Sequence, residues 1–212
     1  QEKEEGGMLL FNGEDTESWR GYNDKAFPDS GWVIQDNALR CIGSGQGEAG
    51  GAGGDIIYDQ RFQDFHLKLE WKISEGGNSG IFYLAEEVPD EPIWKSAPEM
   101  QVLDNERHID AELGDNRMAG SLNDLIAAEP QNAKPAGEWN QVEIMVYQGT
   151  VVHRMNGEKV LEYHLGTDEW KERVTNSKFS EYEWFGKYRE GYIGLQDHGN
   201  DVWFRNIKLK KM

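Results

Sequence analysis

The sequence predicts an all-β protein made of two antiparallel sheets that pack face to face. Many short segments alternate apolar and polar residues with a period of two, which gives each strand a core-facing side and a solvent-facing side. Turn-forming residues, among them many of the 25 glycines, separate these segments. Little of the chain has a helical period and no strand–helix–strand repeat occurs, so a sandwich or barrel is favoured over a parallel α/β fold.

The N-terminal part is predicted to form short strands joined by tight turns. Residues 1–7 are predicted to be a polar, flexible leader, either the remainder of a removed signal peptide or an arbitrary start. Residues 31–42 are predicted as a hairpin that turns at Asp36 and Asn37, which tolerate a two-residue turn. The glycine-rich residues 43–54 lack the Gly-Lys-Ser/Thr ending of a phosphate-binding loop, so a surface loop is expected.

The middle of the chain holds the clearest strand, residues 65–73 (FHLKLEWKI), in which every second residue is apolar. A turn is expected at residues 76–80 and a further strand at residues 81–84. After a long excursion, residues 99–103 (EMQVL) alternate again and predict the next strand.

The second half is predicted to contain one irregular segment and several more strands. Residues 105–138 have no sustained period apart from a possible helical turn at 122–128, and such a long irregular segment is typical of a lid or a site rim. Residues 139–164 are predicted as a three-stranded meander. A helix followed by a loop is expected within 168–189, and the last two strands within 191–209.

One candidate site lies on the strand at residues 99–103. A period of two puts Met100 and Val102 on the core side, and it holds Glu99 and Gln101 side by side on the opposite side. A strand with one apolar face and a carboxylate–amide pair on the other is suited to present a polar ligand site. The simpler alternative is a solvated face on a half-buried strand.

A second stretch, residues 191–199, repeats this pattern. Gln196 and His198 share the side away from the core, whereas Asp197 points the other way and is interpreted as structural. We expect Gln196 and His198 to converge with Glu99 and Gln101 if the two strands lie in one sheet. An exposed His198 beside a turn is the simpler alternative.

These groups suit sugar binding or general-base catalysis, because they combine a carboxylate, an imidazole and two amides. With Asp104 or His108 added, they could also hold one divalent metal ion of unidentified kind through oxygen and nitrogen ligands. Other candidates have simpler interpretations, namely surface positions for three histidines and core packing for three tryptophans that could stack on a sugar. They are His66, His153, His164, Trp94, Trp184 and Trp203.

Composition excludes several classes of partner. The formal charge of −17 argues against nucleic acid and anionic membranes, and fits a neutral ligand or a cation. No apolar run reaches the roughly 18 residues that span a bilayer. Cys41 is the only cysteine, so an intrachain disulfide and a cysteine-based zinc site are both excluded. The oligomeric state is not encoded in any of these patterns.

Six motifs, taken in order, resemble those of the 3-keto-disaccharide hydrolase family, long known as domain of unknown function 1080. They are LFNG at 10–13 with Trp19, GNSGI at 77–81, EMQVLD at 99–104, KPAGEWN at 134–140, GYIGLQDHG at 191–199 and FRNI at 204–207. The resemblance covers residues 8–212, which it marks as a single domain after the leader.

This resemblance implies a concanavalin A-like jelly-roll sandwich that acts on 3-keto-glycosides, in a periplasmic or secreted setting in glycan-degrading bacteria. It implies a carbohydrate substrate and a set of site residues, with Asn78 and Lys134 at the rim. The implied site residues are Glu99, Gln101, Asp104, Gln196 and His198.

Two positions depart from the family pattern. Leu84 stands where many relatives have Arg, which indicates a different substrate. Asn123 stands where relatives often have Tyr, which would alter one wall of the site or weaken activity.

The chemistry expected of such an enzyme needs one base. A ketone at C3 acidifies the hydrogen at C2, a base removes it, the group at C1 leaves, and water adds. His198 or Glu99 can be that base, and we assign His198. Glu99 and Asp104, with His108, would then bind hydroxyls or a metal that polarises the ketone.

Two other functions compete with this hypothesis. A non-catalytic glycan-binding module would have the same fold and the same polar sheet face. An ordinary two-carboxylate glycosidase would need Glu99 to pair with Asp104 or with Asp197, and the alternation places Glu99 and Asp197 on opposite faces.

Overall fold

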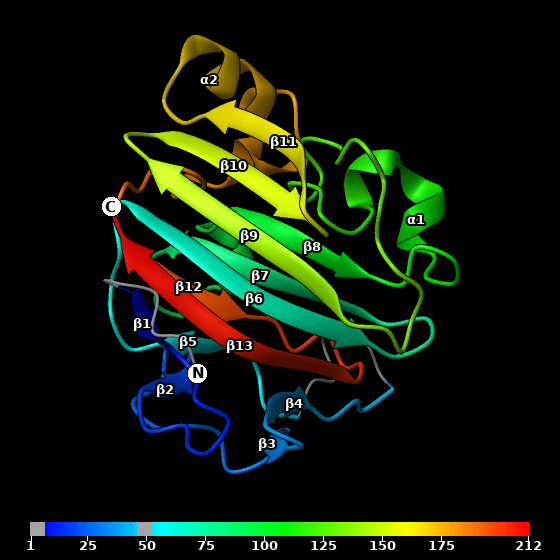
Figure 1. Cartoon of the computed structure of the whole chain (residues 1–212). Helices are drawn as coiled ribbons and strands as arrows, with labels where there is room; N and C mark the ends of the chain where they lie inside the picture. The colour runs from blue at the N-terminus through cyan, green and yellow to red at the C-terminus, as the bar shows by residue number, and fades with distance from the viewer. Residues whose placement is uncertain (1–6, 46–51) are drawn as a thin grey trace.

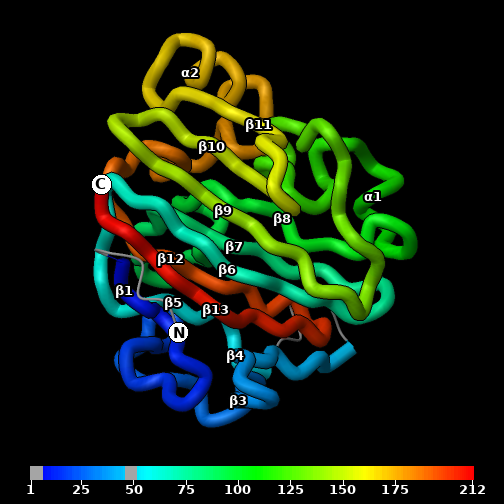
Figure 2. Tube along the Cα trace, in the orientation of Figure 1, coloured from blue at the N-terminus to red at the C-terminus, as the bar shows by residue number. Residues whose placement is uncertain are grey.

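The computed structural model describes residues 7–45 and 52–212, and these form the predicted concanavalin A-like jelly roll (Figures 1 and 2). Two antiparallel sheets pack face to face. The larger has the strand order β11-β10-β9-β6-β13-β4-β3, with β1 also paired to β13, and the smaller has the order β2-β5-β12-β7-β8. Figure 1 shows β9, β6 and β13 of the larger sheet in front of β8, β7 and β12 of the smaller one.

The larger sheet consists of β1 Gly7–Leu9, β3 Trp32–Gln35, β4 Ala38–Cys41, β6 Phe65–Ile73, β9 Asn140–Tyr147, β10 Thr150–Met155, β11 Glu158–His164 and β13 Val202–Lys211. The smaller sheet consists of β2 Trp19–Gly21, β5 Ile56–Tyr58, β7 Asn78–Ala85, β8 Glu99–Leu103 and β12 Tyr192–Leu195. The helices are short: α1 Asp110–Leu113, α2 Asp168–Thr175, and the 3-10 turns η2 Ile93–Lys95, η3 Asp115–Arg117 and η4 Lys178–Glu181. No helix in the described ranges is long and apolar enough to cross a membrane.

The core between the sheets is filled by the alternating residues of the long strands. Strand β6 alternates buried and half-buried residues along its whole length, as predicted, and its buried side includes Phe65 and Trp71. Met100 and Val102 of β8 face them from the smaller sheet and are fully buried. Because Met100 and Val102 take the core side, Glu99 and Gln101 lie on the outer face of the smaller sheet.

Most predicted elements are confirmed. The hairpin of β3 and β4 turns at Asp36 and Asn37, whose φ angles of 52° and 60° are those of a tight two-residue turn. The meander of β9, β10 and β11 is present, and α2 followed by η4 is the predicted helix and loop.

Three predictions about where an element begins or which type it is were wrong. Strand β7 begins at Asn78, inside the predicted turn, because residues 78–82 pair with β8. Residues 122–128 are not helical, since Leu122 forms bridges with Met100 and Ile126. Gly7, predicted as part of the leader, begins β1; residues 1–6 and residues 46–51 of the predicted glycine-rich loop lie outside the described residues.

A segment of the irregular region covers the outer edge of β8. The amide of Gln101 donates to the carbonyl of Ser121 at 3.0 Å, and the amide of Gly120 donates to the carbonyl of Gln101 at 2.9 Å. The amide of Asn123 donates to the carbonyl of Glu99 at 3.0 Å. The segment therefore pairs with β8 almost as a further strand would, and it fixes Asn123 beside Glu99.

His153 lies in the core and not at the surface, which corrects the prediction made for it. Its Nδ1 donates to the carbonyl of Gly120 at 2.9 Å, because a carbonyl can only accept. Its Nε2 then accepts from the Tyr83 hydroxyl at 2.8 Å, which in turn accepts from the Tyr163 hydroxyl at 2.7 Å. Burial lowers the pKa of His153 to about 4, against the opposing effect of the Gly120 carbonyl.

This buried imidazole makes stability depend on pH. The unfolded chain binds a proton at His153 below about pH 6.5, whereas the folded chain binds one only near pH 4. We therefore expect the free energy of unfolding to fall by roughly 3 kcal/mol between pH 7 and pH 4 through this residue. Urea unfolding at both pH values, with His153→Gln beside the wild type, measures the effect; an unchanged pH dependence in the variant would contradict it.

Candidate active site

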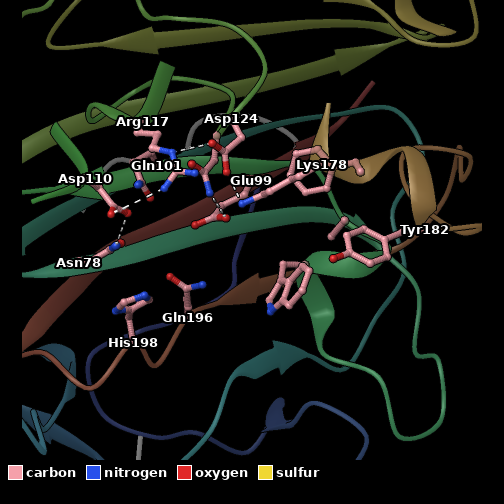
Figure 3. A pocket seen from close by; sticks show the side chains of 14 residues that line it. Asn78, Glu99, Gln101, Asp110, Arg117, Asp124, Lys178, Tyr182, Gln196 and His198 are labelled. Carbon is pink, nitrogen blue, oxygen red and sulfur yellow. Dashed lines mark hydrogen bonds and ion pairs between the residues drawn. The ribbon is translucent and has the colours of Figure 1, made fainter. Parts of the chain in front are cut away.

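A cavity of about 270 Å³ opens on the outer face of the smaller sheet. Its floor is made by Asn78 of β7, by Glu99 and Gln101 of β8, and by Gln196 and His198 just after β12 (Figure 3). The two stretches that the sequence predicted to converge therefore lie in one sheet and line one cavity.

Sheet register brings these side chains together. Gly80 pairs with Gln101 across β7 and β8, and the amide of Gln196 donates to the carbonyl of Gly80 at 3.0 Å. Gly80 thus lies between the two glutamines. Because side chains alternate along each strand, these residues all point to the outer face, and a rigid sheet holds them.

Glu99 is held in one position by its neighbours. Asn123 Nδ2 donates to Glu99 Oε2 at 2.9 Å. The other carboxylate oxygen lies over Gly80, where an added Cβ would come within 2.0 Å of it. Glycine at position 80 therefore provides the space that the Glu99 carboxylate occupies.

Three buried amide side chains present acceptor atoms without a partner among the described residues. The side chains belong to Asn78, Gln101 and Gln196, which are 3%, 1% and 4% exposed, and the atoms are their carbonyl oxygens. A buried acceptor without a partner is unfavourable, so such groups usually indicate a ligand or water that completes them. The geometry suits a ligand with several hydroxyl groups.

His198 lies beside Gln196 on the cavity wall (Figure 3). Its ring contacts that of His108 edge to face, with centroids 6.2 Å apart. Burial lowers the pKa of His108, and the nearby His198 lowers it further, while Asp110 opposes the shift. His108 Nδ1 accepts a hydrogen bond from the amide of Asp110 at 3.1 Å, so His108 supports the site from outside the lining.

Two further predicted site residues lie outside the cavity lining, as His108 does. Asp104 closes the adjoining turns, because its carboxylate oxygens accept from the amides of Gly76 at 2.7 Å and Glu106 at 3.1 Å. Lys134 donates through Nζ to the carbonyl of Trp139 at 3.1 Å.

The predicted metal ligands were Asp104, Glu99 and His108. Within residues 7–45 and 52–212, no three His, Cys, Asp or Glu side chains are placed to hold a metal ion. Both oxygens of Asp104 accept backbone N–H groups. The donor set does not fit a shared ion in this arrangement, so the metal stays a prediction.

A charged cluster that was not predicted from the sequence forms the opposite wall. Arg117 Nε lies 2.6 Å from Asp124 Oδ1, and Lys178 forms an ion pair with the other oxygen of Asp124. Arg117 Nη1 also lies 3.7 Å from Asp110 Oδ1. Three of the four residues come from the irregular segment that was predicted as a site rim, although no pattern identified them individually.

Aromatic side chains complete the cavity. Trp94 and Tyr182 pack edge to face with ring centroids 5.4 Å apart, and Phe179 lies next to them. Of the three tryptophans considered for sugar stacking, Trp94 lines the cavity. Trp203 instead lies on the outer face of the larger sheet under Arg40 and Lys72.

The two departures from the family pattern have different settings. Asn123 donates to Glu99 and lines the cavity. Leu84 is buried in the core with a φ of 52°, at the point where the pairing of β7 and β12 shifts register. A change of residue at position 123 therefore acts on the site directly, whereas Leu84 is not part of the cavity lining.

Comparison with known proteins identifies this jelly-roll sandwich with its polar cavity as a glycoside hydrolase. A family model described as the 3-keto-alpha-glucoside-1,2-lyase-like domain matches residues 6–210. The chain belongs to this family.

Relatives with known names or structures agree with the assignment. A 3-keto-disaccharide hydrolase from Bacteroides thetaiotaomicron is 51% identical over 228 aligned positions, which cover 97% of this chain and 78% of that protein. The crystal structure of a presumed glycosyl hydrolase from Parabacteroides distasonis has 30% identity and a TM-score of 0.88, covering 98% of this chain and 94% of that one. A second such protein from the same organism has 23% identity and a TM-score of 0.74, covering 97% and 99%, and shows the shared fold.

Proposed function

We propose that this enzyme cleaves 3-keto-glycosides, including 3-keto-disaccharides, by elimination followed by addition of water. The observation that carries the proposal is the joint placement of His198 with three buried, unpartnered amide oxygens on one cavity floor. Such a floor can bind the hydroxyls of a sugar while one imidazole reaches a ring carbon. The family and the named relative supply the substrate class.

The reaction proceeds in balanced steps. His198 takes the proton from C2, and the electron pair of the C2–H bond forms the enolate of the C3 ketone. When the enolate collapses, C1 and C2 become doubly bonded, the C1–O bond breaks, and the departing oxygen is protonated. Water then adds its oxygen to C1 and a proton to C2, which restores the 3-keto sugar.

The remaining cavity groups bind the sugar and stabilise the enolate. Negative charge develops on the C3 oxygen, so donors near it lower the barrier. The Lys178 ammonium and the amide groups of Gln101 and Gln196 are such donors at the cavity wall. Glu99, fixed by Asn123 and Gly80, accepts a hydrogen bond from a sugar hydroxyl and orients the ring.

A two-carboxylate mechanism would need Glu99 to pair with Asp104 or Asp197, and both of these carboxylates bind backbone amides instead. Asp104 closes a turn, and Asp197 accepts from the amides of Gly53, Gly54 and Gly199 at 3.0–3.1 Å. Asp124, which does line the cavity, is ion-paired with Arg117 and Lys178. Both of its carboxylate oxygens are therefore already engaged by cationic side chains.

Turnover of matched substrates tests the proposed function. We expect product from a 3-keto-glucoside and none from the same glucoside without the ketone, because the ketone makes C2–H acidic. Deuterium at C2 should slow the reaction several-fold if that proton is removed in the rate-limiting step. Cleavage of the unoxidised glucoside at a similar rate would favour the two-carboxylate mechanism, and saturable binding without product would favour a glycan-binding module.

The proposal includes a periplasmic or extracellular setting, which is supported by the family resemblance. Fractionation of the native bacterial cells checks it, and recovery of the protein with the cytoplasm would contradict it.

A further inference from the structure

We propose that Trp94 and Tyr182 form the subsite that holds the leaving group, so that the enzyme prefers substrates whose leaving group is a second ring. This inference rests on the proposed function, because it extends the same cavity. It assigns a role to the aromatic half of the lining, which the elimination chemistry does not use.

The cavity has two chemically different halves. Asn78, Gln196 and His198 lie together on one side in Figure 3, and Tyr182 lies at the opposite side. The first half presents amide oxygens and an imidazole. The second half presents rings, with the Lys178 ammonium projecting toward Glu99 between the two halves.

The aromatic wall is held in place by its surroundings. Ile93, next to Trp94 in η2, is fully buried and lies over Gly194, where an added Cβ would be 2.7 Å from Ile93 Cδ1. The Lys95 ammonium lies 5.3 Å from the centre of the Tyr182 ring. A wall fixed in this way loses little conformational freedom when a ligand packs on it.

Core packing does not account for the whole of this wall. Neighbouring Phe179 and Phe185 stack with centroids 3.9 Å apart and are buried. Trp94 and Tyr182 are only half-buried and line the cavity. Their rings, each with an apolar face and a polar tip, border a site that is otherwise largely polar, which suits the C–H face of a sugar ring or an aromatic ring.

The direction of the reaction places the leaving group there. If His198 removes the C2 proton, the keto sugar occupies the polar half, where the three amides receive its hydroxyls. The bond from C1 to the departing oxygen then leads across the cavity toward the rings.

Two substrates that differ only in the leaving group test the inference. In Trp94→Ala, kcat/KM for a 3-keto-disaccharide should fall about tenfold, mainly through KM, because an aromatic contact of this kind is lost. For the methyl 3-keto-glucoside it should change less than about twofold, since no ring contacts the wall. Trp94→Phe should recover much of the loss. Trp203→Ala, which removes a half-buried tryptophan from the other sheet, serves as the matched control and should leave the ratio of the two substrates unchanged.

An equal loss for both substrates, or no loss for the disaccharide, would overturn the inference. Binding distinguishes this outcome from failure of the proposed function. If the wild type turns over neither substrate, calorimetric titration with trehalose and with methyl glucoside still reports on the subsite. Weaker binding of trehalose alone by Trp94→Ala would support the subsite, and equal binding of trehalose by variant and wild type would overturn it.

Discussion

Replacement of His198 by Ala is expected to lower kcat for a 3-keto-glucoside by roughly 10²- to 10⁴-fold, the usual contribution of a general base. The imidazole lies at the cavity wall beside Gln196, and its removal leaves no other histidine in the lining of the described cavity. The measurement is release of the leaving group under saturating substrate, with the folded state checked by thermal unfolding.

His164→Ala is the matched control for this variant. His164 is exposed on β11 of the larger sheet, so its loss should leave the rate unchanged. Substrate affinity should change little in His198→Ala, because the amides and Glu99 remain. If the His198→Ala variant turned over substrate at the wild-type rate, His198 could not be the general base.

Gly80→Ala is expected to reduce kcat/KM by roughly a hundredfold while the protein still folds. The new Cβ would meet the Glu99 carboxylate at 2.0 Å, and that carboxylate is the end of a flexible side chain that can move away. Its displacement breaks the 2.9 Å hydrogen bond from Asn123. The sugar hydroxyl that Glu99 orients would then lose its acceptor.

A double-mutant cycle shows whether this effect passes through Glu99. In a Glu99→Ala background the carboxylate is already absent, so adding Gly80→Ala should lower activity little further. Additive losses would mean that residue 80 acts on the sheet itself and not on Glu99. Steady-state kinetics on the wild type, both single variants and the double variant give the answer.

Strand alternation carried most of what the sequence could predict. The period of two fixes which side of β8 faces the core, and therefore that Glu99 and Gln101 share the outer face. The same rule applied to β10 would have found His153, which shares its side with Val151 and Met155, both fully buried. Because histidine is polar, His153 was predicted at the surface. In the core, its ring nitrogens are instead satisfied by hydrogen bonds with Tyr83 and Gly120.

The residues of the opposite wall of the cavity could not be predicted from strand alternation. Arg117 and Asp124 lie in a segment without a period, and Lys178 lies in another far along the chain. Tertiary packing and complementary charge bring these three residues together, and no local sequence pattern predicts either. The same holds for Asp104, whose carboxylate is adjacent to the site in sequence but is used by the backbone of two turns.

The segment that pairs with β8 has a consequence for how this protein can change. It supplies Asn123 to the cavity, and it also occupies the hydrogen-bonding groups along the outer edge of β8. An uncovered edge strand is a template for pairing with other chains and hence for aggregation. Substitutions that reshape this wall to admit new substrates therefore carry a solubility risk, and variants selected for altered specificity should be screened for self-association as well as for activity.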